Sequence, residues 1–235
     1  MAKLYISSVL LVIAACVSNI NADGAEGGVA TTISAHPYIV SLQGSDGSKV
    51  CGGVLIDTTT VVTAAQCLNF YDVSQLVVGV SNGAKVVKIA GSTFNIGFDF
   101  TTMENDVALV KLAEAVSVGS IAVATEQPTN GVSGVVTSWD ASNNLVDIAE
   151  TVIGTSECGS GDYKYSEDEI LSSMLCGLAT NANACGALPG SPLIANSQLV
   201  GLVSWGYGCG NKGNPAVFTD IPSLASWISS SAKSL

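Results

Sequence analysis

Residues 51–67 read CGGVLIDTTTVVTAAQC, and this stretch decides the fold. Two runs rich in Val, Leu and Ile flank the polar residues DTTT, a pattern that predicts two short strands joined by a turn. Similar runs recur at roughly 8 to 12 residue intervals between Gly, Asn, Asp and Ser clusters. They are YIVSL, LVVGV, VVKIAG, DVALVKL, GVVTSW, IAETVIG, LVGLVSW and AVFTDI. This spacing predicts an all-β barrel or sandwich, with a helix over residues 224–233.

The amino terminus predicts export. Residues 1–22, MAKLYISSVLLVIAACVSNINA, place Lys3 before a short apolar run and end in the small Ala22, which is the pattern of a signal peptide. The apolar run is too short to span a bilayer. We therefore expect a secreted, extracellular protein that is not anchored in a membrane. The remaining chain suffices for one all-β domain or two small barrels, and residues 117–127, which carry little strand signal, divide two strand-rich halves.

Charge excludes one class of partner. The chain of 235 residues has a formal net charge of -11, with 19 acidic residues, eight lysines and no arginine. Nucleic-acid binding needs a basic stripe that neutralises phosphates, and none exists here. The densest acidic stretch is either a solvated loop or a docking surface for a basic partner. Its acidic residues are Glu157, Asp162, Glu167, Asp168 and Glu169.

The cysteines suit an oxidising compartment. One of the seven, Cys16, lies in the predicted signal peptide, and the other six form an even set for which three disulfides are expected. One histidine and six paired cysteines make no zinc-type cluster, so we expect no metal and no cofactor.

Several motifs then occur in a fixed order. HPYIVSLQ, CGGVLI, TAAQC, NDVALVKL, VTSW, SWGYGC and NPAVFT, followed by the terminal helix, resemble the trypsin-like or chymotrypsin-like serine protease family. The resemblance implies two six-stranded antiparallel β-barrels with a site in the cleft between them and a C-terminal helix. It implies an N-terminal barrel over residues 25–118 and a C-terminal barrel with the helix over residues 119–235, together one peptidase-like domain. The implied disulfides are Cys51 to Cys67, Cys158 to Cys176 and Cys185 to Cys209.

The positions that correspond to the catalytic triad of the family are altered. TAAQC places Gln66 where the family has its histidine base, and an amide cannot accept a proton near neutrality. Asp106 of NDVALVKL keeps the carboxylate position, and we interpret it as a buried acceptor for the Gln66 amide and the Ser204 hydroxyl. The histidine of the chain, His36, lies outside the triad position.

The nucleophile motif aligns without a gap to CGALPGSPL, which places Pro189 at the nucleophile. Proline has neither a hydroxyl nor a backbone N–H, so the nucleophile and one oxyanion-hole donor are both lost. Ser191 lies two residues too late, at a position where the family has glycine. Leu188 replaces the aspartate that pairs with the new amino terminus after activation.

The other half of the activation pair is missing as well, because the expected start of the mature chain reads AEGG at residues 25–28 and Gly24 replaces the basic cleavage residue. The degenerate specificity-pocket positions are Asn183, Ser204, Gly206 and Ala216. Two lost triad members and a lost oxyanion donor predict that the chain is not an enzyme.

The altered base and nucleophile, in a secreted chain without arginine, are similar to the scabies mite inactivated serine protease paralogues, relatives of the group 3 mite allergens. That resemblance implies a pseudoprotease that binds host complement proteins and inhibits complement in immune evasion, and we expect it to be a monomer. An alternative is a decoy that binds protease inhibitors or substrates through the residual groove, since SWG at residues 204–206 is intact. Residual hydrolysis is a third, less favoured hypothesis.

Overall fold

The computed structural model describes residues 25–235 except 161, 167, 182–185 and 208–212. The predicted signal peptide lies outside the described residues. So do Glu167, the specificity-pocket position Asn183, and Cys185 and Cys209 of the third implied disulfide.

The first barrel closes in the order β2-β3-β4-β7-β6-β5. Its strands are β2 (Ile39–Gln43), β3 (Lys49–Leu55), β4 (Thr60–Thr63), β5 (Val77–Val80), β6 (Lys85–Phe94) and β7 (Ala108–Leu112). All neighbouring strands are antiparallel, and the β3–β4 hairpin comes from the stretch 51–67. Valines and leucines that alternate along these strands fill the barrel, among them Val40, Leu55, Val61 and Val110.

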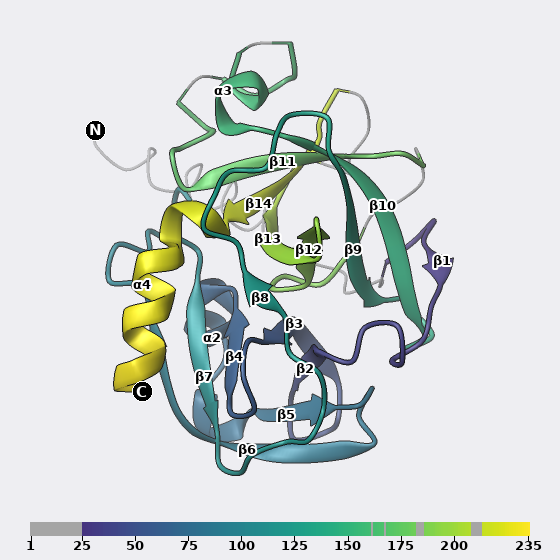
Figure 1. The fold of residues 1–235 in the computed structure, drawn as a ribbon, viewed down its shortest axis with the longest axis vertical. Coiled ribbons are helices and arrows are strands. Elements are labelled where there is room, and N and C mark those ends of the chain that lie inside the picture. Colours follow the sequence, from purple (N-terminus) through teal and green to yellow (C-terminus); the bar gives the residue numbers. More distant parts are fainter. Residues whose placement is uncertain (1–24, 161, 167, 182–185, 208–212) are drawn as a thin grey trace, which may run out of the picture.

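The second barrel closes in the order β10-β11-β14-β13-β12-β9, because β9 also pairs with β10. Its strands are β9 (Ser133–Trp139), β10 (Leu145–Ile153), β11 (Met174–Ala179), β12 (Pro192–Ala195), β13 (Gln198–Trp205) and β14 (Ala216–Asp220). Two short strands, β1 (Val29–Ala30) and β8 (Ala122–Val123), pair with β10 and β13 from outside the ring. The expected pair of six-stranded barrels is therefore confirmed, and Figure 1 shows one above the other.

Some elements differ from the sequence pattern. The strands β11 and β12 were not among the predicted runs, because β11 is interrupted by Cys176 and Gly177 and β12 has only four residues after the PGS turn. Three short helical segments were also unanticipated: α2 (Ala65–Phe70), η1 (Val73–Gln75) and α3 (Thr155–Cys158). The segment that contains β1 lies before the first barrel in sequence but pairs with the second, so the division at residues 118–119 does not describe its contacts.

The terminal helix α4 (Ile221–Ser234) joins the two barrels at one side, where Figure 1 shows it along their common edge. It begins three residues before the predicted start, with a proline in its first turn. Its apolar face packs in one cluster with side chains of both barrels, including Leu109 of β7 and Leu202 of β13. In the part of the chain that the structure describes, no helix is long and apolar enough to cross a membrane.

Candidate functional site between the two barrels

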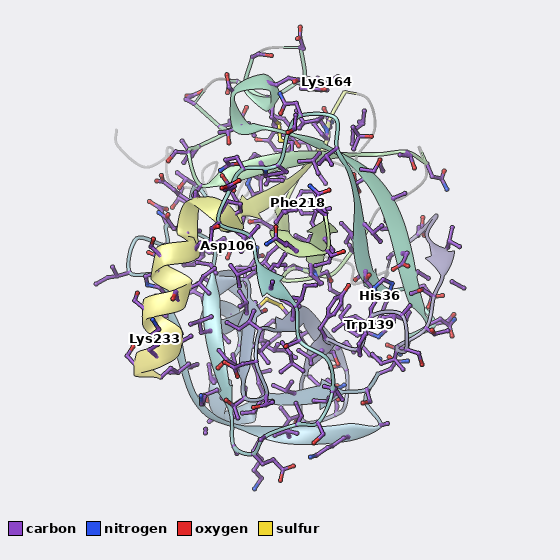
Figure 2. The ribbon with its side chains drawn as sticks, viewed as in Figure 1. His36, Asp106, Trp139, Lys164, Phe218 and Lys233 are labelled. Atoms are coloured by element: carbon purple, nitrogen blue, oxygen red, sulfur yellow. A yellow bond between two sulfur atoms is a disulfide. The ribbon has the colours of Figure 1, made fainter. Side chains whose placement is uncertain are left out.

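Asp106 is the centre of the candidate site. It lies just before β7, is fully buried, and appears in Figure 2 at the level where the barrels meet. The backbone N–H of Gln66 donates to its Oδ1 at 2.9 Å, and Gln66 Nε2 donates to its Oδ2 at 2.7 Å. Gln66 belongs to the first turn of α2, directly after β4. The two strands β4 and β7 are paired neighbours, so the barrel itself brings both residues together.

The second barrel completes this network. Ser204 of β13 donates from Oγ to Asp106 Oδ2 at 2.6 Å, and its carbonyl oxygen accepts from Gln66 Nε2 at 2.9 Å. Thr219 of β14 donates from Oγ1 to the Asp106 carbonyl at 2.7 Å. The expected donors to the carboxylate are therefore both present, and both amide hydrogens of Gln66 are directed at acceptors within the fold.

Two opposing effects act on the Asp106 carboxyl. Burial raises its pKa, because a charge is less stable away from water, while the hydrogen bonds from Ser204 and Gln66 lower it by stabilising the ionised form. Burial is the larger effect, so the pKa lies above its ordinary value. A buried carboxyl with this many donors connects the two barrels through hydrogen bonds.

The segment 188–191 forms the second half of the site. The carbonyl of Pro189 accepts from the N–H of Gly52 on β3 at 2.8 Å, which ties this segment of the second barrel to the first. Gly190 donates to the Val203 carbonyl, and Val203 donates to the Ser191 carbonyl, at 2.8 and 2.9 Å. Proline has no N–H, so position 189 offers no backbone donor to a ligand.

Ser191 and Leu188 are both turned into the protein. Ser191 is fully buried, and its Oγ donates to Ser138 Oγ at 3.0 Å. Leu188 packs in an apolar cluster with Ile39, Trp139 and Leu145. The predicted substitution at position 188 thus places a hydrocarbon side chain where the resemblance implies an ion pair. Ala25, at the expected start of the mature chain, donates from its N–H to the Trp139 carbonyl at 2.6 Å.

The chain is similar to known proteins over most of its length. The family model described as Trypsin matches residues 25–228. The chain belongs to the trypsin family. The match spans both barrels and the first half of α4, as the resemblance implied.

Relatives within the trypsin family are 36–40% identical to this chain over most of its length. Trypsin of Sarcophaga bullata is 40% identical over 88% of this chain and 89% of its own length. Trypsin theta of Drosophila erecta is 38% identical over 89% and 86%, and trypsin alpha of Drosophila melanogaster is 36% identical over 89% and 88%.

One expectation is corrected by these comparisons. From positions 66 and 189 we predicted that the chain is not an enzyme; that prediction is wrong, because the relatives are named as trypsins and match over most of the chain. The prediction rested on side chains at a few positions, whereas membership of the trypsin family rests on residues throughout both barrels.

Three of the four specificity-pocket positions, Ser204, Gly206 and Ala216, lie among the described residues. Ser204 and Ala216 are held by strands β13 and β14, and Gly206 follows β13. A Cβ at Gly206 would lie 3.6 Å from Ala216 Cα and 3.7 Å from the Tyr165 hydroxyl oxygen, which is ordinary contact. Tyr165 itself is buried and donates to the Pro215 carbonyl at 2.6 Å. Gly206 therefore has room for a small side chain.

His36 lies away from this site, as expected. Its Nε2 is 2.8 Å from Asp147 Oδ2 of β10, and its Nδ1 is 3.1 Å from the Tyr38 hydroxyl oxygen. Figure 2 shows His36 beside Trp139, on the side of the molecule away from α4, whereas Asp106 lies at the level where the barrels meet. Burial raises the pKa of Tyr38, and the negative charge of Asp147 adds to that effect. The contacts of His36 attach the amino-terminal segment to the second barrel.

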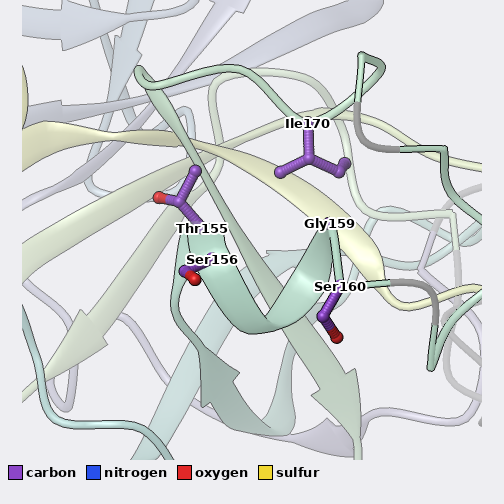
Figure 3. Close-up of a pocket in the computed structure, with 5 residues that line it drawn as sticks. All are labelled: Thr155, Ser156, Gly159, Ser160 and Ile170. Carbon is purple, nitrogen blue, oxygen red and sulfur yellow. The ribbon is translucent and has the colours of Figure 1, made fainter.

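A shallow pocket of about 450 Å³ lies beside α3, at the start of the acidic stretch, and is shown in Figure 3. The lining residues are Thr155, Ser156, Gly159, Ser160 and Ile170. Two of the carboxylates hold local structure: Glu157 accepts from Asn130 Nδ2 at 2.6 Å, and Glu169 accepts from Ser166 and from the Tyr207 hydroxyl. No group of three or more potential metal ligands occurs among the residues that the structure describes.

Disulfides stabilise two parts of the fold. Cys51 of β3 is bonded to Cys67 of α2, and Cys158 of α3 is bonded to Cys176 of β11. These are two of the three pairs that the resemblance implied. The first of them fixes α2, and therefore Gln66, against the first barrel.

Proposed function

We propose that this trypsin-family chain is a secreted, extracellular protein that acts by binding host proteins. The proposed partners are complement components, and the proposed outcome is inhibition of complement in immune evasion. The observation that carries the proposal is that the residues at positions 66 and 189 make hydrogen bonds within the fold. Gln66 bonds to Asp106 and Ser204, and the Pro189 carbonyl bonds to Gly52, so these groups join the barrels. Such contacts favour a role in which the fold presents a surface to a partner.

Two further features support this function. The substitutions at positions 66 and 189 are those on which the similarity to the scabies mite paralogues rests, and that similarity points to host complement. The charge of -11 without a single arginine gives the molecule a negative field that attracts basic protein surfaces and accelerates their association.

The experiment is complement-dependent haemolysis in human serum. The purified protein, correctly disulfide-bonded, is added over a concentration series, beside an unrelated secreted protein of similar acidity. We expect dose-dependent inhibition by this chain and none by the control. No effect at micromolar excess would overturn the complement proposal.

The same preparations are tested on a panel of fluorogenic peptides, since the chain belongs to a family of proteases. Cleavage of complement components in step with haemolysis inhibition would assign the effect to proteolysis and overturn the binding proposal. Inhibition without fragments on a denaturing gel would support it.

The decoy hypothesis has less support. It requires the main chain of residues 204–206 to pair with an extended peptide, yet the Ser204 carbonyl already accepts from Gln66. Replacing Gly206 with valine tests it, because the position has room for a Cβ. Loss of partner binding in Gly206→Val would favour the groove, and binding equal to that of the parent protein would favour the outer surface.

A further inference from the structure

Phenylalanine is distributed unusually in this molecule. The chain has five phenylalanines, and four of them lie at residues 70 and 94–100 of the first barrel. Only Phe218, in the second barrel, belongs to a buried core cluster. Phenylalanine contributes a large free energy when it is buried, so its placement at a surface is informative.

Most of the exposed large hydrophobic side chains come from two segments of the first barrel. Among the described residues, eight large hydrophobic side chains are exposed, and five of them come from residues 70–71 and 94–100. We call these five the aromatic surface: Phe70, Tyr71, Phe94, Ile96 and Phe100. Ile96 is 98% exposed and Phe70 is 50% exposed. A cluster of this kind marks an interaction site more often than isolated exposed residues do.

Ring contacts connect the two segments of the aromatic surface. Phe70, at the end of α2, packs edge-to-face against Phe100 of the β6–β7 loop, with ring centroids 4.9 Å apart. The rings of Phe94, the last residue of β6, and Phe98 in that loop have centroids 6.5 Å apart in a similar geometry. The rings therefore support one another and leave their outer faces to solvent.

The loop that carries these rings is held in one shape. Asn95 Oδ1 accepts from the N–H of Gly97, and Asn105 Nδ2 donates to the Gly97 carbonyl, at 2.8 and 3.0 Å. The backbones of Asp99 and Glu104 pair across the loop as an isolated antiparallel β-bridge. The N–H of Asn105 also donates to Ser173 Oγ of the second barrel at 2.8 Å. Binding by this loop would cost little conformational entropy, because its backbone is already ordered.

The charges around the aromatic surface indicate which kind of partner it would attract. Residues 70–72 and 94–104 contain three acids, Asp72, Asp99 and Glu104, and no lysine. Asp72 and Asp99 are each oriented by a backbone N–H of their own turn, from Ser74 and Thr101. A second copy of the chain would bring acid against acid, and an anionic membrane would be repelled. A partner with apolar side chains bordered by lysine or arginine would be attracted.

We propose that the aromatic surface is where this protein docks its partner, and that the partner presents apolar side chains within a basic border. This inference rests on the proposed protein-binding function and assigns it to a place on the molecule. The apolar side chains of the partner cover the rings, and its cations meet the three carboxylates at the edge.

The test uses synthetic peptides as probes. A fluorescein-labelled peptide of alternating phenylalanine and arginine is titrated with the mature protein, and binding is read from fluorescence anisotropy. Two control peptides replace arginine with glutamate or phenylalanine with serine. We expect the first peptide to bind and both controls to bind much more weakly. Equal binding of all three would overturn the proposal.

Variants locate the binding. The double variant Ile96→Ser/Phe100→Ser is expected to weaken binding of the probe by roughly tenfold or more, since both side chains would be covered. Asp99→Lys is expected to weaken it several-fold and to reduce its dependence on salt. Val29→Ser, which removes an exposed apolar side chain from β1 of the second barrel, serves as the matched control and should bind as the parent does. Circular dichroism verifies that each variant is folded.

Three other outcomes are informative. Sedimentation that shows a dimer of the parent protein, abolished by Ile96→Ser/Phe100→Ser, would identify a second copy as the occupant and overturn the basic partner. Haemolysis inhibition that survives in the double variant would overturn this surface while leaving the proposed function in place. Probe binding without haemolysis inhibition would do the reverse.

Discussion

Gln66 Nε2 lies 2.7 Å from Asp106 Oδ2, and the same nitrogen lies 2.9 Å from the Ser204 carbonyl oxygen. One side-chain amide thus connects α2, the segment just before β7, and β13. The first two belong to the first barrel and the third to the second, so this contact couples the barrels at the buried centre of the candidate site. Removal of any member takes a hydrogen-bond partner from at least one of the others in a buried place.

Replacing Asp106 with alanine should therefore destabilise the fold strongly. Three donors lose their acceptor, and we expect the free energy of unfolding to fall by about 3 kcal/mol. Urea denaturation followed by tryptophan fluorescence measures the change. Asp46→Ala is the control: Asp46 is exposed and accepts from its near neighbour Ser48, so its loss should cost less than about 1 kcal/mol. Equal losses in the two variants would contradict this role of Asp106.

Glu150 should make the stability depend on pH. It points from β10 into the second barrel, is 4% exposed, and its Oε2 has no hydrogen-bond partner in the described part of the chain. Burial raises its pKa from 4.5 to about 8. The folded state then holds a proton that the unfolded state releases, so the free energy of unfolding falls as pH rises from about 4.5 to about 8.

The change from Glu150 alone is on the order of 4 kcal/mol across that interval. Glu150→Gln should remove most of it, and the melting temperature of the variant should fall less between pH 5 and pH 8 than that of the parent. Glu126→Gln, at an exposed position, is the matched control. A variant whose melting curve shifts with pH as much as the parent's would rule out this role for Glu150.

Gly190 should not tolerate alanine. Its φ of +78° lies in the left-handed region, and a Cβ there would lie 2.5 Å from both the Gly52 carbonyl oxygen and Thr63 Oγ1. We expect Gly190→Ala to cost roughly 3 kcal/mol or more, from strain and a steric clash together. Gly131 has a φ of +82° and nothing within 4 Å of its Cβ, so Gly131→Ala should cost only about 1 kcal/mol. Thermal unfolding of both variants separates the clash from the strain.

The disulfide between Cys51 and Cys67 should stabilise the first barrel. It closes a segment of 16 residues that contains the β3–β4 hairpin, and loop-closure entropy predicts a contribution of about 3 kcal/mol. The double variant Cys51→Ala/Cys67→Ala should lose this amount in chemical denaturation. A loss below about 0.5 kcal/mol would show that the hairpin and α2 are held by packing alone.

Much of the architecture could be predicted from local patterns. Runs of β-branched residues at regular spacing indicated most strands, and the pattern of residues 224–233 indicated the terminal helix. The strands β11 and β12 escaped, because one contains Cys176 and Gly177 and the other is very short. Their conformation is imposed by neighbouring strands rather than by their own propensity. The altered residues at positions 66, 188 and 189 could be found by alignment of motifs alone.

The contacts of the candidate site could be predicted only in part from the sequence. Donors to Asp106 could be named from chemistry, but the bond from Gly52 to the Pro189 carbonyl depends on how the barrels meet. The aromatic surface could not be predicted either, since phenylalanine in a chain of this composition is expected in a core. The same is true of Glu150, whose place inside the second barrel follows from the register of β10 against β9 and β11.

By itself, then, the sequence determined the strand pattern, the family and the identity of the altered side chains, because hydrophobic periodicity and motif spacing are properties of neighbours along the chain. Only the tertiary structure decided which polar groups are buried together and which aromatic rings face water. Those outcomes depend on residues far apart in sequence, such as Gln66 and Ser204 or Phe70 and Phe100, and on the free energy of removing each from solvent.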